Sequence, residues 1–185
     1  MLSTRNKIIV IADQLIRQRG YNAFSYADIA ATLNLKNAAI HYHFPSKAKL
    51  GVAVIDETRE KFKNHIETYK ALSSLEQLNT FFDMYSKNSK HESICFMGAL
   101  GASFNTLPDE MTIALAEAHK EIVAWLNKLL ATGKEKGEFN FTVEPQKITD
   151  LITSSILASL VLQRVSNQEK LNNVRQTILT EILTK

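Results

Sequence analysis

Two short helical segments joined by a tight turn, between residues 25 and 44, constrain the fold of this chain more than any other feature. The first lies in FSYADIAATLNL. Ser25 can cap its N-terminus, and Asp28, three residues later, completes an S-x-x-D capping box and favours the positive end of the helix dipole. Asn34 tolerates a positive φ angle and ends this helix in a turn.

The second segment begins near Lys36 or Asn37 and has to end by Phe44, because Pro45 disfavours the helical conformation in the residue before it. Two such helices joined by three or four residues form a helix-turn-helix, in which the second helix lies in the major groove of DNA. The spacing therefore predicts a DNA-reading element at residues 25 to 44.

The second helix divides its side chains between a core and an exposed edge. At about 100° per residue, Ile40 and Phe44 share the inward side, whereas Asn37 and His41 lie on the other edge with Tyr42 beyond them. Tyr42 can either cover the edge of a small core or present its hydroxyl to DNA, and an amphipathic tyrosine can do both.

The charges of the chain concentrate at its start. Residues 1 to 49 carry seven Lys or Arg against two Asp and no Glu, whereas residues 71 to 185 carry eleven Lys or Arg against thirteen Asp or Glu. A basic head on a nearly neutral body is typical of a phosphate-binding module, and a chance solvated face is the alternative.

Composition narrows the cellular setting. The 185 residues are 45% hydrophobic, enough for one good core or two small ones. No run reaches the roughly 18 to 20 uncharged apolar residues of a membrane span, and Asp13 interrupts the N-terminal apolar run too early for a secretory signal. The single cysteine, Cys95, excludes an internal disulfide and agrees with a reducing compartment. We therefore expect a cytoplasmic protein without a membrane partner.

Apolar residues recur at spacings of three and four along the whole chain, which predicts an all-α fold of about nine helices. We expect a three-helix helix-turn-helix head at residues 1–49 and a larger helical body at 50–185. The body should open with a helix capped by Ser74 and Gln77, and long helices should follow at about 108–136, 144–165 and 168–183.

The N-terminal sequence TRNKIIVIADQLIRQRGYNAFSYADIAATLNLKNAAIHYHFPSKAKL resembles the TetR family of bacterial transcriptional regulators over residues 4 to 50, because RGY…FSYADIA is paired with IHYHFPSK. This resemblance implies a double-stranded DNA operator as partner, and an effector-binding and dimerisation role for the body at residues 50–185. It implies base contacts by Asn37, Ala38 and Tyr42 and phosphate contacts by Ser25, Tyr26, His41 and Lys47. Lys36 is a further DNA-binding candidate. The sequence departs from the family pattern at Asn34 (usually glycine), Lys36 (often serine or threonine) and His41 (usually tyrosine).

The last two predicted helices have the composition of an assembly surface. Small residues alternate with apolar ones in the first, and an apolar stripe follows in the second. The residues expected at the interface are Leu151, Ser155, Ala158, Ser159, Leu162, Val174, Ile178 and Ile182. In the family that the head resembles, two such helices from each subunit form a four-helix dimer interface; completion of a monomeric bundle is the alternative.

The segment ICFMGALGASFNTLPDEM resembles a subgroup of the same family that responds to electrophiles such as aldehydes and quinones. The resemblance makes Cys95 a candidate sensor thiol, although small buried packing is the simpler interpretation of one cysteine. Phe96, Phe104, His119 and Trp125 are candidates to line an effector pocket, and each is also a reasonable core residue.

We therefore predict a homodimeric TetR-type repressor, not an enzyme, that is released from a palindromic operator by a small hydrophobic or electrophilic effector. A helical protein-binding adaptor with a vestigial helix-turn-helix is the alternative. A di-iron bundle would need two Glu-x-x-His pairs, and the sequence has none. His41 and His43 point about 200° apart on a helix and cannot share a metal ion. We expect neither a cofactor nor a metal.

Overall fold

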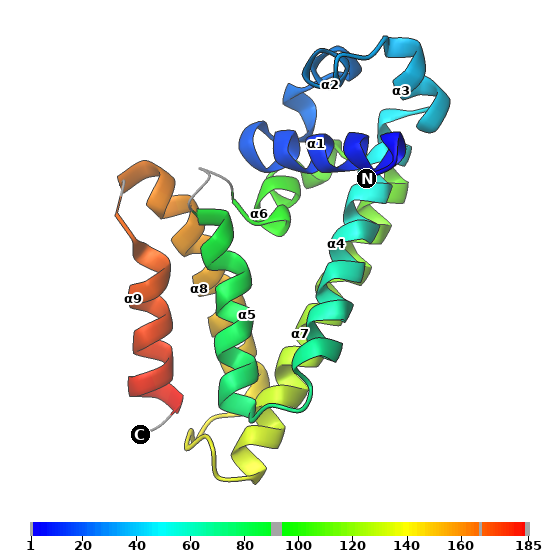
Figure 1. The fold of residues 1–185 in the computed structure, drawn as a ribbon. Coiled ribbons are helices and arrows are strands. Elements are labelled where there is room, and N and C mark those ends of the chain that lie inside the picture. Colours follow the sequence, from blue (N-terminus) through cyan, green and yellow to red (C-terminus); the bar gives the residue numbers. More distant parts are fainter. Residues whose placement is uncertain (1, 90–93, 167, 184–185) are drawn as a thin grey trace. The chain divides into compact units, whose positions relative to one another are not determined.

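The computed structural model describes residues 2–89, 94–166 and 168–183, and all regular structure in these ranges is helical (Figure 1). The prediction of an all-α fold is thereby confirmed. The helices are α1 (Thr4–Arg19), α2 (Tyr26–Leu33), α3 (Asn37–His43), α4 (Lys47–Tyr69), α5 (Ser74–Ser89), α6 (Phe96–Gly101), α7 (Asp109–Glu135), α8 (Pro145–Ser166) and α9 (Lys170–Thr177). Short 3₁₀ turns occupy Tyr21–Ala23 and Phe104–Thr106, and a π-helical turn occupies Ile178–Leu183.

The chain forms two compact units. The first unit comprises Met1–Lys63 and Phe96–Ala118, and the second comprises Asn64–Cys95 and His119–Lys185. In the first unit, α4 runs without interruption through residues 49 and 50, and α6 packs against α1. The division into a head at residues 1–49 and a body at 50–185 stays a prediction.

The first unit is built around a small aliphatic core. α1 ends at Gly20, whose φ of 88° lies in the region that favours glycine, and its amide still donates to Ile16. α4 approaches α7 closely at Gly51, where a Cβ would lie 2.4 Å from the sulfur of Met111. The fully buried side chains of this unit include Ile8, Ile16, Ile29, Ile40, Leu50, Ile55 and Met111.

In the second unit, α5 packs against both α8 and α9, which also pack against each other (Figure 1). Phe81 on α5 is fully buried, and its ring centroid lies 5.2 Å from that of Trp125 on α7. Arg175 of α9 donates to the side-chain oxygens of Asn79 and Asp83, both at 2.6 Å. These two hydrogen bonds hold α9 against α5.

The cap of α5 differs from its prediction by one residue. Ser73 and Glu76 form the capping pair: the Ser73 amide donates to Glu76 at 3.0 Å, and the Glu76 amide donates to the Ser73 hydroxyl at 3.2 Å. Ser74, expected in that role, is instead only 2% exposed, and it lies where a Cβ on Gly133 would be 2.9 Å from its own Cβ.

α8 is the most apolar long helix in the described part of the chain. By length and composition alone this 22-residue helix is apolar enough to cross a membrane, although it contains Lys147, Asp150 and Arg164, so the expectation that no run of 18 to 20 residues is uncharged still holds. One third of its most apolar 18-residue window is buried within the protein. Several of its remaining aliphatic side chains are exposed, namely Leu151, Leu157, Val161, Leu162 and Val165.

Candidate nucleic-acid interface

The turn between α2 and α3 has the geometry that the sequence predicts. Asn34 adopts a left-handed conformation with φ 53° and ψ 49°, and its amide donates back to the carbonyl oxygens of the last turn of α2. At the other end of α2, the carboxylate of Asp28 accepts hydrogen bonds from the amide and the hydroxyl of Ser25, both at 2.7 Å. These bonds, together with the nearby Arg19, lower the pKa of Asp28 below its usual value.

The C-terminal end of α3 is held from two sides. The Tyr26 hydroxyl donates to the carbonyl oxygen of Phe44 at 2.8 Å in a buried hydrogen bond. Burial, with a smaller contribution from Tyr21, raises the pKa of Tyr26 to about 12, so the phenol keeps the proton that it donates. On the other side, the guanidinium of Arg5 lies 5.1 Å from the centroid of the Phe44 ring.

Lys47 holds the connection from α3 to α4. Its ammonium group donates to the carbonyl oxygen of Phe24 and lies 4.2 Å and 4.7 Å from the centroids of the Phe24 and Tyr21 rings. Burial lowers the pKa of Lys47, and the nearby Asp28 opposes that shift. The loop before α2 is thereby fastened to the first turn of α4.

The outward face of α3 carries the three predicted base-contacting residues and one predicted phosphate contact. Asn37, Ala38 and Tyr42, predicted to contact bases, and His41, predicted to contact a phosphate, are all exposed, and 84% of the Tyr42 surface is open to solvent. His41 is steadied by an edge-on contact with Tyr26, at a centroid distance of 4.7 Å. Ile40, in contrast, is fully buried and anchors the helix. α3 therefore presents an exposed row of polar and aromatic groups.

Two residues predicted to contact phosphates have partners within the protein. Tyr26 is 9% exposed, and its hydroxyl donates to the Phe44 carbonyl oxygen. Lys47 is half-buried, and its ammonium donates to the Phe24 carbonyl oxygen. Both phosphate contacts stay predictions. Ser25 and Lys36 are exposed, and their predicted contacts stay predictions. Arg5 was missed, since its role depends on a ring that is 39 residues away in sequence.

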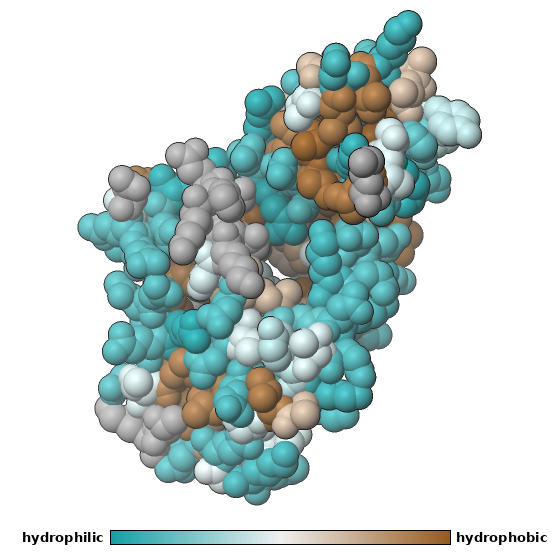
Figure 2. Space-filling model, in the orientation of Figure 1, coloured by the Kyte–Doolittle hydropathy of each residue, from teal (hydrophilic) through white to brown (hydrophobic). Residues whose placement is uncertain are grey.

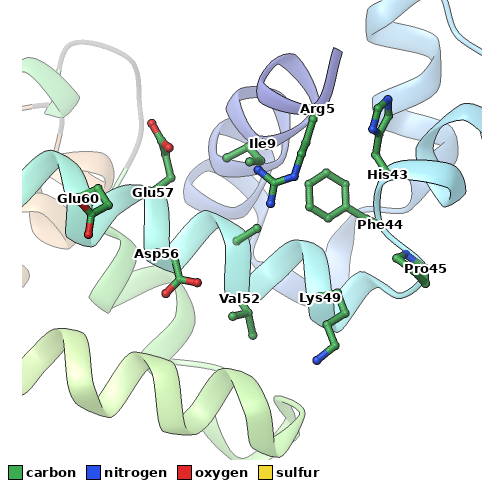
Figure 3. A pocket seen from close by; sticks show the side chains of 11 residues that line it. Arg5, Ile9, His43, Phe44, Pro45, Lys49, Val52, Asp56, Glu57 and Glu60 are labelled. Carbon is green, nitrogen blue, oxygen red and sulfur yellow. The ribbon is translucent and has the colours of Figure 1, made fainter. Parts of the chain in front are cut away.

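A mixed-charge groove of about 520 Å³ lies beside this interface, between the start of α1, the end of α3 and α4 (Figure 3). Arg5, His43 and Lys49 contribute basic groups to its lining, and Phe44 and Val52 contribute apolar surface. Three carboxylates on α4, those of Asp56, Glu57 and Glu60, also line it. Along α4 the visible surface is largely hydrophilic (Figure 2).

The predicted effector residues are divided between the two units. Phe96 and Phe104 belong to the first unit, where Phe96 is buried and Phe104 is exposed. Cys95, His119 and Trp125 belong to the second, where Cys95 is buried, His119 is exposed and Trp125 is half-buried. A shared pocket stays a prediction. The described ranges contain no cluster of three metal-ligating side chains.

The predicted dimer residues also differ in exposure. Leu151, Ala158 and Leu162 are exposed on α8, and Ser155 and Val174 are half-buried. Ser159 and Ile178 are only 3% and 2% exposed within the chain itself, and their place in the dimer interface stays a prediction. The side chain of Ile182 lies outside the described residues.

Models of known protein families match both the N-terminal and the C-terminal part of the chain. The model of bacterial regulatory proteins of the tetR family matches residues 8–54, and that of the tetracyclin repressor-like C-terminal domain matches residues 72–178. A TetR transcriptional regulator of known structure from Legionella pneumophila is 31% identical, with a TM-score of 0.89 over 98% of each chain.

The HTH-type transcriptional repressor NemR of Escherichia coli is 23% identical over 190 residues, covering 98% of this chain and 94% of that protein. The structure of reduced E. coli NemR aligns with a TM-score of 0.83 over 97% of this chain and 96% of the other, at 19% identity. The second comparison supports the fold alone.

Proposed function

Because this chain belongs to the TetR family of transcriptional regulators, we propose that it is a cytoplasmic, homodimeric repressor that binds a palindromic operator through α3. Members of this family are regulators and not enzymes. The observation that carries the proposal is the outward face of α3, where Asn37, Ala38, His41 and Tyr42 stand exposed on a helix whose end is fixed by Tyr26 and Arg5.

Rigid positioning matters because base readout needs side chains held at defined places in the groove. Phosphate contacts set the register, and the excess of basic residues in the first 49 supplies the attraction. A dimer explains how a seven-residue helix selects a site, since two copies read half-sites about 34–36 Å apart. The exposed aliphatic side chains of α8 supply a surface for that dimer.

We assign release from the operator to a small hydrophobic or electrophilic effector bound in the C-terminal helical body. An effector that prefers one arrangement of the heads shifts the population away from the DNA-binding state. The test is to add a small quinone to the protein–operator complex, with Cys95→Ser as the matched variant. Release of the wild type but not of the variant supports an electrophilic effector, and equal release of both supports a non-covalent one.

Selection of bound sequences from a random DNA pool, at two salt concentrations, tests the DNA-binding proposal. The proposal expects an inverted repeat whose affinity falls steeply with salt, because released counterions drive phosphate binding. Tyr42→Ala is the matched variant, since its exposed side chain contributes little to the core. Recovery of no motif, with the same weak binding by both proteins, would favour the adaptor alternative.

A further inference from the structure

We infer that each operator half-site presents an adenine to Asn37 and a neighbouring thymine methyl group to Ala38. This inference rests on the proposed function, and it deepens it by naming the bases that the helix reads. It follows from which side chains of α3 are uncovered, and from which hydrogen-bonding groups those side chains have.

The composition of α3 disfavours the commonest specific contact with DNA. Arginine or lysine reads guanine through O6 and N7, and the seven residues Asn37–His43 include neither. The nearest cation is Lys36, which precedes the helix as its N-cap and has an extended backbone with φ −83°. A guanine contact by Lys36 is therefore the competing interpretation.

Asn37 has the groups that adenine requires. Its amide can donate to N7 and accept from the N6 amino group, a bidentate pair specific to adenine in the major groove. The side chain is exposed, and among the described residues no partner within the protein engages its amide. Asn37 is also the first residue of α3, and N-terminal residues of a recognition helix contact base edges.

Ala38 supplies the complementary apolar contact. It is exposed beside Asn37, and its short side chain lets the helix approach the base edges closely. The thymine C5-methyl group is the apolar feature that the major groove offers to such a side chain. His41 and Tyr42 lie one turn later, and the ring of His41 already contacts Tyr26 at a centroid distance of 4.7 Å.

The test uses the full-length protein and the recovered operator, with single base analogues placed in one half-site. 7-Deazaadenine removes the N7 acceptor, and uracil removes the thymine methyl group. At the adenine that Asn37 contacts, 7-deazaadenine should weaken operator binding by the wild type but should not change operator binding by Asn37→Ala. Each Asn37–adenine pair that is lost should weaken binding by about 5-fold to about 150-fold, and Asn37→Ala removes one such pair from each half-site. Loss of one thymine methyl group should weaken binding by about fourfold.

Asn37→Asp is a sharper variant, because a carboxylate accepts from the N4 amino group of cytosine. It should move the preference at that position from adenine to cytosine. An unchanged melting temperature for each variant establishes that the fold is intact. An inverted repeat that shows no Asn37-dependent adenine, or a core of G·C pairs that depends on Lys36, overturns this inference alone. Failure to recover any inverted repeat overturns the proposed function as well.

Discussion

α3 and α8 both leave side chains uncovered, but the chemistry of the two exposed faces is opposite. α3 is seven residues long, buries Ile40 and exposes hydrogen-bonding groups such as Asn37 and Tyr42. α8 is 22 residues long and exposes aliphatic groups, with Leu162 at 55% and Val165 at 82%. Polar groups suit a hydrated, charged partner such as DNA, whereas aliphatic groups suit a dry protein interface.

The largest effect is expected from a charge placed on the exposed aliphatic face of α8. Leu162→Glu should weaken the dimer by at least about 100-fold, because an unpaired buried charge costs about 3–5 kcal/mol. Sedimentation measurements over a range of protein concentrations give the dissociation constant. Lys147→Glu, at an exposed position of the same helix, is the matched control and should leave it unchanged. A dimer equally stable in both variants would assign the interface to another surface.

The second test divides α3 into its buried and exposed sides. Ile40→Ala should destabilise the protein by about 2–5 kcal/mol, because it leaves a cavity where the side chain is now fully buried. Tyr42→Ala should leave the free energy of unfolding nearly unchanged and lower operator affinity instead. Urea unfolding and operator titration of both variants check this division. Equal destabilisation by the two changes would show that Tyr42 belongs to the core.

A smaller effect is expected beneath α3. Tyr26→Phe removes the donor to the buried Phe44 carbonyl and should cost about 1–3 kcal/mol of stability. It should also weaken operator binding, because the end of α3 becomes less rigid. Thermal unfolding and operator titration measure the two effects. If binding fell while stability stayed constant, the Tyr26 hydroxyl would be a DNA contact, as first predicted.

The smallest effect concerns the cap of α2. The pKa of Asp28 is lowered in the folded protein, so its ionised form favours folding at neutral pH. This contribution is complete above the ordinary pKa of 3.8 and is lost as the pH falls through the lowered value. The melting temperature of the wild type should therefore be higher than that of Asp28→Asn at pH 6, and the two melting temperatures should converge as the pH falls below 3.8. A constant difference down to pH 2 would contradict this role.

Local chemistry made the two helices of the helix-turn-helix predictable. The left-handed turn at Asn34 and the limit set by Pro45 each depend on a few neighbouring residues, and the structure has α2 and α3 where these signals place them. The exposed face of α3 follows from helical periodicity about Ile40.

Contacts between distant residues were not predictable in the same way. Tyr26 was predicted to contact a phosphate, and no local sequence signal marks the Phe44 carbonyl as the partner of its hydroxyl. That carbonyl comes within hydrogen-bonding distance only because α3 ends beside Tyr26 in the fold. The last helix was expected to be continuous to Leu183. Its final turn is π-helical instead, and the Leu183 carbonyl there accepts a hydrogen bond from the amide of Asn140.

The ratio of operator affinity to affinity for an unrelated duplex tests the central claim most directly. It should be measured at one salt concentration for the wild type and for the double variant Asn37→Ala/Tyr42→Ala. If α3 reads sequence and the basic head supplies general attraction, the ratio falls towards one in the variant while binding to the unrelated duplex is unchanged. A variant that retains the wild-type ratio would show that another part of the chain selects the operator.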